Sequence, residues 1–453
     1  MNGELDLERL IALLREKGCR KLYVKELAEN DNTKNQPYFG SDFETLNILP
    51  NQGVRVSNTA GARPNFKANL AFAWMDPRGV LHIASHAKLI LYPKYPEVRF
   101  SGFLKGCDGA PSALMQPRTP GEPPIPLRLL FLGVRDDGLI VGYLTLATST
   151  MARQFVELRL VNRIGVFTDA SSLLTGTLVD SRVVLLQRLH EIHLRQWIDS
   201  RRLRADGESV PCSAQNCGGL TLEAEFNILP NALSAPDFMG WELKQHGVPS
   251  FENLGARLLT HSKAITLMTP EPTAGYYRTG GVVGFVRRYG HADMHGVVDR
   301  MNFSGVYRSG QENPRTRLTL QLLGYDSTSD KMTDVSGGIA LISDSGVEAA
   351  KWLFADLMNH WNRKHDKTAY VPAIRRNEPC PQYFFGPIVR LGEGTDFLRF
   401  LRAVAQGIVY YDPGIHVTNM STRPVQKRRS QFRIKSNAIA HLYTTLTQED
   451  VSQ

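Results

Sequence analysis

Three charged residues near the middle of the chain have the types and the spacing of a hydrolytic site. Asp237 follows a proline, and Glu242 and Lys244 stand two positions apart after the short segment Phe-Met-Gly-Trp. Side chains two positions apart on a β-strand point to the same face, so a strand here presents Glu242 and Lys244 together. Two carboxylates and one ammonium suit a divalent metal ion and a water held for attack on a phosphodiester. Upstream, Glu223 supplies a further carboxylate in the sequence Thr-Leu-Glu.

The overall charge is consistent with a nucleic-acid partner. The 453 residues include 53 Lys and Arg against 44 Asp and Glu, which gives a formal net charge of +9. A basic excess attracts phosphates, although many basic proteins bind no anion. By itself this excess does not separate a hydrolytic site from the alternative, an exposed strand on which Glu242 and Lys244 pair incidentally.

Cysteine usage and hydropathy indicate a cytoplasmic protein without membrane association. Five scattered cysteines do not form a disulfide framework, and Cys212 and Cys217 lack a second pair at zinc-binding spacing, so we expect reduced thiols. Residues 1–18 predict an amphipathic helix and not a signal peptide. The longest apolar runs have the length of strands and are too short to span a bilayer.

The elements that must position these residues fall into two expected domains. Up to about residue 170, short apolar runs are separated by turn signals, a pattern that predicts a barrel or pseudobarrel of short strands. A helix is expected over roughly 180–205, and the segment 203–217 lacks periodicity and is predicted to be a linker. The expected organisation is therefore an N-terminal domain over 1–202, the linker over 203–217 and a second domain over 218–453.

The segment around the charged residues resembles a known nuclease family. Residues 218–244, GGLTLEAEFNILPNALSAPDFMGWELK, resemble the active-site segment of the MvaI/BcnI restriction endonucleases and, more distantly, of the MutH mismatch-repair nickase. The pattern TLE, then PD, then GWELK carries the resemblance, which extends over 215–453. It implies a PD-(D/E)xK nuclease fold, in which helices flank a mixed sheet. It also implies Mg²⁺-dependent DNA cleavage by a monomer at CCWGG or CCSGG.

Two segments of the N-terminal half resemble a different DNA-binding fold. Residues 21–36, KLYVKELAENDNTKNQ, are similar to the start of the EcoRII effector domain, and residues 91–106, LYPKYPEVRFSGFLKG, to its basic DNA-reading segment. This resemblance implies a DNA-binding β-pseudobarrel that also reads CCWGG, and hence a mixed α+β chain overall. The two resemblances agree on one target, which favours CCWGG and suggests that a second copy of the site must be bound for full activity.

The nuclease resemblance implies a role for each charged residue. Asp237 and Glu242 are expected to ligate Mg²⁺ together with the Leu243 carbonyl, and Lys244 to hold the attacking water and a phosphate oxygen. Glu223 is expected to act beyond these ligands or to bind a second ion. Glu225 is the alternative for that role, but the TLE match selects Glu223.

Reading a G·C-rich target calls for side chains that reach base edges, such as arginine on guanine or a carboxylate on cytosine. In the second domain, the family's spacing of major-groove readers selects Arg402, His416 and Arg423. In the N-terminal domain the candidates are Lys25, Asn30, Lys94, Glu97 and Arg99. The segment 412–424 predicts a loop, from which such side chains can project. The alternative for each candidate is a solvated charge, and Arg402 in particular lies in the pattern of an ordinary helix.

The sequence therefore predicts a type II restriction endonuclease that cleaves double-stranded DNA at CCWGG with Mg²⁺ and is stimulated by a second site on its N-terminal domain. Its expected partners are DNA, in up to two copies, and a cognate cytosine methyltransferase. The alternatives are a MutH-like nicking enzyme of DNA repair and a non-catalytic DNA-binding regulator. The intact set of Asp237, Glu242 and Lys244 argues against the regulator.

Overall fold

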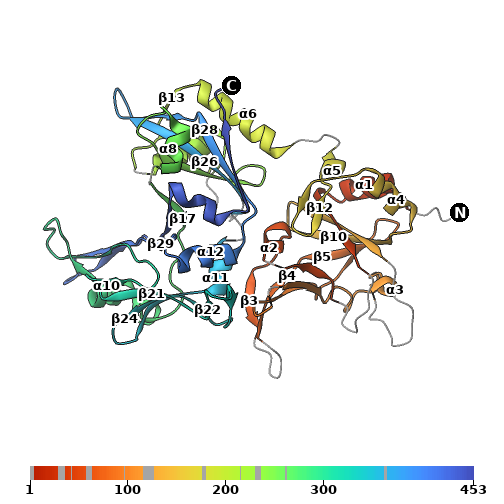
Figure 1. Cartoon of the computed structure of the whole chain (residues 1–453), viewed down its shortest axis with the longest axis horizontal. Helices are drawn as coiled ribbons and strands as arrows, with labels where there is room; N and C mark the ends of the chain where they lie inside the picture. The colour runs from red at the N-terminus through yellow and green to blue at the C-terminus, as the bar shows by residue number, and fades with distance from the viewer. Residues whose placement is uncertain are drawn as a thin grey trace. The chain divides into compact units, whose positions relative to one another are not determined.

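The computed structural model describes the whole chain except residues 1–4, 29–35, 42, 58–63, 96, 116–126, 176–179, 215, 230–235, 261–262 and 362–364. It divides into two compact units, residues 1–180 and 181–453 (Figure 1). Both units mix strands with helices and are rich in sheet. None of the described helices has the length and hydropathy needed to cross a membrane.

Two β-sheets form most of the first unit. One has seven strands in the order β11-β12-β1-β9-β10-β5-β6, and the other has five in the order β2-β8-β7-β4-β3. The strands are β1 (Cys19–Leu27), β2 (Tyr38–Gly40), β3 (Val54–Ser57), β4 (Asn65–Asn69), β5 (Phe72–Met75), β6 (Leu81–Ile83), β7 (Lys88–Tyr92), β8 (Glu97–Ser101), β9 (Arg128–Arg135), β10 (Ile140–Leu146), β11 (Arg163–Ile164) and β12 (Phe167–Asp169). The helices are α1 (Leu7–Glu16), α2 (Thr45–Ile48), α3 (Ser112–Met115), α4 (Thr150–Glu157) and α5 (Ser172–Thr175).

Apolar contacts hold helices on one sheet of the first unit and join that sheet to the other. Helix α1 begins after Asp6, whose carboxylate accepts the N–H of Arg9, and its leucines pack with residues of β1 and β9 beneath α4 and α5. Between the two sheets, Phe72 of β5 meets Phe100 of β8 with ring centroids 5.1 Å apart. Phe39 of β2 likewise meets Phe167 of β12, with ring centroids 5.3 Å apart. These aromatic contacts join the two sheets into one core.

A mixed sheet forms the centre of the second unit. Its strands run in the order β13-β27-β26-β28-β33, and β16 pairs with β26. The pairing of β16 with β26 is parallel, whereas β27 and β28 pair with β26 in the antiparallel sense. The strands are β13 (Trp197–Asp199), β16 (Trp241–Gly247), β26 (Lys367–Arg376), β27 (Gln382–Phe385), β28 (Ile388–Glu393) and β33 (Thr445–Asp450).

Smaller sheets and eight helices surround this centre in the described part of the unit. The smaller sheets contain β14 (Arg201–Leu203) and β15 (Ser209–Pro211); β17 (Ala264–Met268), β32 (Phe432–Lys435) and β29 (Tyr410–Tyr411); β18 (His291–Ala292), β19 (Arg300–Ser304), β30 (Gly414–Thr418) and β31 (Val425–Lys427); β20 (Glu312–Asn313), β21 (Leu318–Leu323), β24 (Gly338–Ser343) and β25 (Glu348–Leu353); and β22 (Tyr325–Asp326) with β23 (Lys331–Met332). The helices are α6 (Ser181–Leu194), α7 (Cys217–Glu225), α8 (Leu254–Thr260), α9 (Tyr276–Thr279), α10 (Gly281–Tyr289), α11 (Phe354–Trp361), α12 (Phe397–Ala405) and the 3₁₀ helix η1 (Ser436–Leu442).

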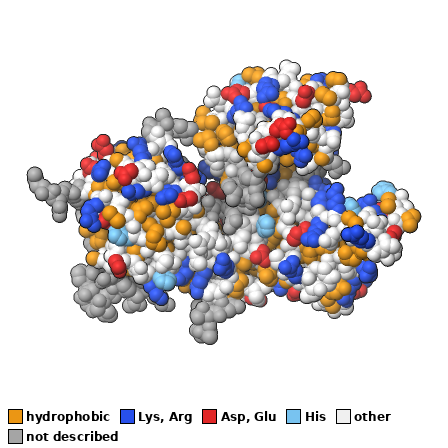
Figure 2. Space-filling view, turned by 180° about the vertical axis from the view of Figure 1, so that it is seen from behind, with side chains coloured by type: hydrophobic (Ala, Val, Ile, Leu, Met, Phe, Trp, Pro, Cys, Tyr) orange, Lys and Arg blue, Asp and Glu red, His pale blue; other side chains and the backbone are white. Residues whose placement is uncertain are grey.

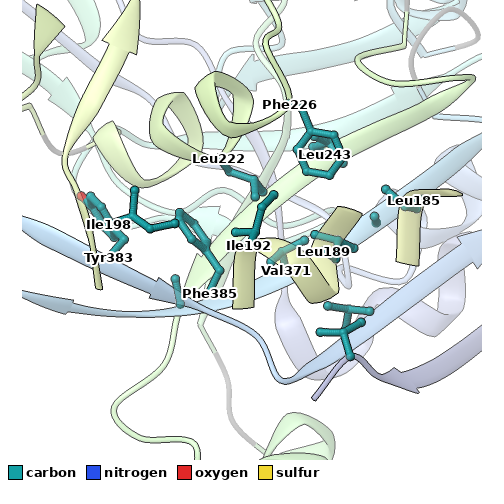
Figure 3. Close-up of a cluster of buried hydrophobic side chains, with 14 of the residues drawn as sticks. Leu185, Leu189, Ile192, Ile198, Leu222, Phe226, Leu243, Val371, Tyr383 and Phe385 are labelled. Atoms are coloured by element: carbon teal, nitrogen blue, oxygen red, sulfur yellow. The ribbon is translucent and has the colours of Figure 1, made fainter. Parts of the chain in front are cut away.

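The two faces of the central sheet differ in chemistry. On one face Leu243, Val371 and Phe385 pack against apolar side chains of α6 and α7 (Figure 3). Because neighbours along a strand alternate, the residues on either side of Leu243, Glu242 and Lys244, face the opposite way. The sheet thus buries its apolar face beneath two helices and leaves its polar face for the charged pair.

The structure shifts the domain boundary that the sequence predicts. The leucines and the isoleucine on the apolar face of α6 (Leu185, Leu189 and Ile192) pack onto the central sheet, so α6 belongs to the second unit and not to a domain ending at 202. The expected linker 203–217 is folded as well, since β14 and β15 form a hairpin. Its strands have three residues each, too few for periodicity to reveal them.

The prediction of reduced thiols is wrong for two of the five cysteines. Cys212 and Cys217 form a disulfide with their Cα atoms 5.8 Å apart, between the β14–β15 hairpin and the start of α7. Cys19, Cys107 and Cys380 are free thiols. Closeness in sequence made this pair possible, but only the turn into α7 brings the two Cβ atoms together.

Candidate active site

A tight hairpin places Asp237 beside β16. Phe238 and Trp241 exchange both backbone hydrogen bonds, at 2.9 and 2.8 Å. The two residues between them, Met239 and Gly240, have φ of 47° and 89°, the positive values of a type I′ turn, which glycine adopts without strain. The turn folds Asp237 back onto the strand, where its Oδ2 accepts the N–H of Leu243 at 2.9 Å. The four residues between Asp237 and Glu242 are therefore the residues of this tight turn.

Glu242 and Lys244 form a buried ion pair on the polar face of the sheet. The Lys244 Nζ lies 2.7 Å from Glu242 Oε1. The Glu242 side chain is 4 % exposed and the Lys244 side chain 19 % exposed. Burying a charge costs less free energy when an opposite charge lies beside it, and this contact pairs the two side chains. The structure therefore brings Asp237, Glu242 and Lys244 together on β16 and its hairpin.

Neighbouring strands extend this polar face with residues that the sequence gave no reason to select. Lys244 is in register with Tyr370 of β26, and Tyr370 with Arg390 of β28. The Tyr370 hydroxyl lies 2.9 Å from that of Tyr443, and burial raises the pKa of Tyr443 to about 12. Burial also lowers the pKa of Arg390 to about 10. No local motif marks these residues, because only strand pairing aligns them.

A buried histidine lies within the electrostatic field of the ion pair. His365 stacks on Trp361 with ring centroids 4.3 Å apart, and its Nε2 lies 3.0 Å from the carbonyl of Leu267. Burial, and then the charge of Lys244, lower the pKa of His365 to about 4. The ring is therefore neutral near pH 7 and adds no second positive charge beside Lys244.

The structure separates the two glutamates of α7. Glu225 is buried, with a side chain 1 % exposed, and forms ion pairs with Arg195 and, at 2.8 Å, with Arg201. Glu223 is half-buried, and two residues along a helix rotate a side chain by roughly 200°, so it projects away from these arginines. Glu225 therefore holds α7 to its neighbours through Arg195 and Arg201.

The acids of the site do not assemble into a cluster of three. Among the described residues, no group of three or more His, Cys, Asp or Glu side chains is arranged to hold a metal ion. Glu223 thus does not complete a three-acid site with Asp237 and Glu242. An ion here would be held by these two carboxylates with further oxygen atoms from the main chain or water.

Comparison with known proteins places this site in a family. The model of the MvaI/BcnI restriction endonuclease family matches residues 186–443, more than half of the 453 residues. The chain belongs to the MvaI/BcnI restriction endonuclease family. It is therefore a type II site-specific DNA endonuclease. The match begins within α6, earlier than the expected start at 215 and in accord with the placement of α6 in the second unit.

Two solved structures of MvaI are similar to this chain. MvaI in a complex with its cognate DNA substrate is 16 % identical to this chain, with a TM-score of 0.44. The match covers 61 % of this chain and 100 % of the MvaI chain. MvaI in the absence of DNA is also 16 % identical, with a TM-score of 0.34, and covers 60 % of this chain and 98 % of its own. No curated protein sequence matches the chain.

The second unit carries the three predicted base readers at three different places. His416 lies on β30 and Arg423 in the exposed turn before β31, so the segment 412–424 is partly strand and not only a loop. Burial, followed by the charges of Arg300 and Lys427, lowers the pKa of His416. Arg402 lies on α12 and forms an ion pair with Asp330, so it does not simply meet solvent.

In the first unit, two of the five predicted base readers lie over a tyrosine ring, and a third, Glu97, pairs with one of them. Lys25 Nζ and Arg99 Cζ lie 5.9 and 5.4 Å from the centre of the Tyr38 ring, and Arg99 Nη2 lies 2.7 Å from Glu97 Oε2. Tyr38 was missed from the sequence, because it meets Arg99 only through the pairing of β2 with β8. Lys94 lies in an exposed turn, and Asn30 lies outside the described residues.

Proposed function

We propose that this restriction endonuclease cleaves double-stranded DNA at CCWGG with Mg²⁺, and that its first unit binds a second copy of the site. The observation that carries the catalytic part is the convergence of Asp237, Glu242 and Lys244 through one hairpin and one ion pair. The choice of CCWGG rests on the sequence resemblances of the two halves, which agree on this target.

The donor set of the site fits Mg²⁺. Asp237 and Glu242 offer only carboxylate oxygens, the ligands that a hard divalent cation prefers, and the described part of the chain gathers no group of three metal-binding side chains there that would favour a softer ion. Bound at these carboxylates, the ion would lower the pKa of a water and neutralise charge on the scissile phosphate.

The protein's own residues position the catalytic groups and stabilise the charge that develops on the phosphate. The N–H of Leu243 fixes the Asp237 carboxylate, and Glu242 fixes the Lys244 ammonium. In the proposed reaction Lys244 donates hydrogen bonds to the attacking water and to a non-bridging phosphate oxygen, and so stabilises the negative charge that develops there. Glu223, at the end of α7, is proposed to act on the same water network beyond the metal ligands.

The first unit is proposed to be the effector. Its two sheets are compatible with a DNA-binding pseudobarrel, and the group of Lys25, Glu97 and Arg99 around Tyr38 offers both donors and an acceptor for base edges. Glu97 is proposed to accept from cytosine, and Arg99 to grip guanine or phosphate. An EcoRII-like effector joined to an MvaI-like nuclease resembles the layout of UbaLAI. We propose a cytoplasmic monomer that acts beside a cognate cytosine methyltransferase.

A plasmid with two CCWGG sites is expected to be cut faster than one with a single site. Coupling between two binding sites is typically worth about 1–3 kcal/mol, which corresponds to a rate ratio of roughly 5- to 150-fold. The measurement is the initial rate of linear product with Mg²⁺, with and without an added CCWGG duplex. Equal rates would remove the effector from the proposal, and a product that stops at the open circle would favour a nicking enzyme.

Replacing Arg99 by alanine is expected to bring the ratio of two-site to one-site cleavage rates close to one. The guanidinium is held by Glu97 and lies over Tyr38, so its loss removes a fixed donor from the effector surface. The matched control is Arg78→Ala, which removes an exposed arginine also paired with an acid two residues away. An unchanged ratio in Arg99→Ala would exclude this cluster from binding the second site.

A further inference from the structure

A small antiparallel sheet in the second unit has one apolar and one polar face. Its strands run in the order β18-β19-β30-β31. Phe303, Ile415 and Val417 are buried on one face, where Phe303 meets Phe285 of α10 with ring centroids 4.7 Å apart. The opposite face therefore carries the residues that alternate with these.

Residues that can contact nucleic acid occupy the polar face in register. One row across the four strands consists of His291, Asn302, His416 and Lys427. The next row pairs Arg300 of β19 with Thr418 of β30. In the space-filling view, Lys and Arg side chains gather on the lobe of the second unit that carries these strands (Figure 2). A two-stranded β-ribbon fits the major groove of DNA, and the paired strands β19 and β30 form such a ribbon.

One arginine on this face is fixed by a half-buried aspartate. Arg300 Nε lies 3.2 Å from Asp293 Oδ2 and donates to Asn302 Oδ1 at 3.1 Å. Asn302 Nδ2 also donates to Asp293 Oδ2, at 2.8 Å. The Asp293 side chain is 3 % exposed, and its Oδ1 accepts the backbone N–H groups of His295 and Val297. The hydrogen bond from Asn302 is the largest influence that lowers the pKa of Asp293, so the carboxylate stays charged.

These contacts fix the orientation of the two Nη atoms of Arg300. The contacts to Asp293 and Asn302 use Nε, and within the described part of the chain no hydrogen bond involves the two Nη atoms of Arg300. The side chain is 29 % exposed. The Asp293 charge weakens the long-range attraction of Arg300 for phosphates, whereas the directional N–H donors remain. A guanidinium with a fixed orientation and two available donors can bind the O6 and N7 atoms of one guanine together. A phosphate contact does not require such a fixed orientation.

We propose that Arg300 is a guanine-reading residue of this endonuclease, and that Asp293 is the positioning residue that orients it. The inference rests on the proposed function only in requiring DNA cleavage; it does not depend on which sequence is cut. It adds a base contact on β19 beside the reader expected on β30, His416.

The test measures how well each variant of the full chain discriminates between target base pairs. Cleavage kcat/KM is determined for Arg300→Ala and Arg300→Lys on the wild-type target and on duplexes in which each base pair in turn is replaced. In both variants we expect the ratio of kcat/KM between the target and the substituted duplex to fall roughly 5- to 150-fold at one G·C pair, the range for one bidentate contact. The ratios at the other positions are expected to stay unchanged. Arg300→Lys retains the charge and reports on the contact even if Arg300→Ala folds poorly.

Two further variants, and the pattern of losses across the target, decide the inference. Asp293→Asn is expected to lower the preference for the same base pair by a smaller factor and to leave the preference at the other positions unchanged. Arg317→Ala, which removes an exposed arginine paired with Glu312, is expected to keep every preference. A uniform loss at all positions in the Arg300 variants would show a phosphate contact and overturn the proposal, as would full discrimination. A wild-type chain that cuts at no specific sequence would instead refute the proposed function.

Discussion

Lys244→Ala is expected to lower the rate of DNA cleavage by about 10²–10³-fold, the effect of removing one preorganised donor to the charge that develops in the transition state. Sequence-specific binding is expected to survive, because Lys244 lies on the central sheet and not on the elements that carry the proposed base readers. The measurement is a single-turnover cleavage assay with Mg²⁺, beside a binding assay with Ca²⁺ in its place.

Asp237→Asn tests the same site by removing the charge of a proposed metal ligand. The amide retains an oxygen for the N–H of Leu243 but loses the charge that a cation needs, so cleavage is expected to fall at least as far as in Lys244→Ala. Asp206→Asn is the matched control, since Asp206 also accepts a backbone N–H nearby in sequence, that of Glu208, but lies exposed on the β14–β15 hairpin. Undiminished cleavage in Asp237→Asn would remove the active-site assignment.

Glu225→Gln is expected to destabilise the second unit by about 2–4 kcal/mol while leaving the active-site groups in place. Removing one partner of a buried ion pair typically costs about 3–5 kcal/mol, and the value here is lower because Arg195 and Arg201 are partly exposed and regain water. Urea unfolding followed by tryptophan fluorescence measures this change, because every tryptophan except Trp74 lies in the second unit.

Glu223→Gln is the matched variant on the same helix. Glu223 is half-buried, and its substitution leaves the pairs of Glu225 with Arg195 and Arg201 intact, so the unfolding midpoint is expected to fall less than in Glu225→Gln. Its cleavage rate is expected to fall if it acts on the water network of the site. A large loss of stability in Glu223→Gln, with none in Glu225→Gln, would contradict the division of roles that the structure gives to α7.

Local sequence determined the parts of the site that depend on short-range geometry. The period of two along a strand is enough to place Glu242 and Lys244 on one face, and the segment Phe-Met-Gly-Trp is the length of a tight hairpin. The TLE, PD and GWELK pattern indicated the family to which the match over residues 186–443 assigns the chain. The short strands of the first half also followed from local sequence, since short apolar runs are separated by turn signals there.

Only the tertiary structure decided which residues surround these groups. Glu223 and Glu225 are the same residue type two positions apart, and the arginines that pair with Glu225 come from the turn after α6 and from β14. The helix α6 was assigned to the wrong domain because its apolar face does not specify which sheet it covers. Tyr370 beside Lys244, and Tyr38 beside Arg99, depend on the register of strands far apart in the chain. Spacing along one strand is a local property of the backbone, whereas strand partners are selected by the packing of the whole unit.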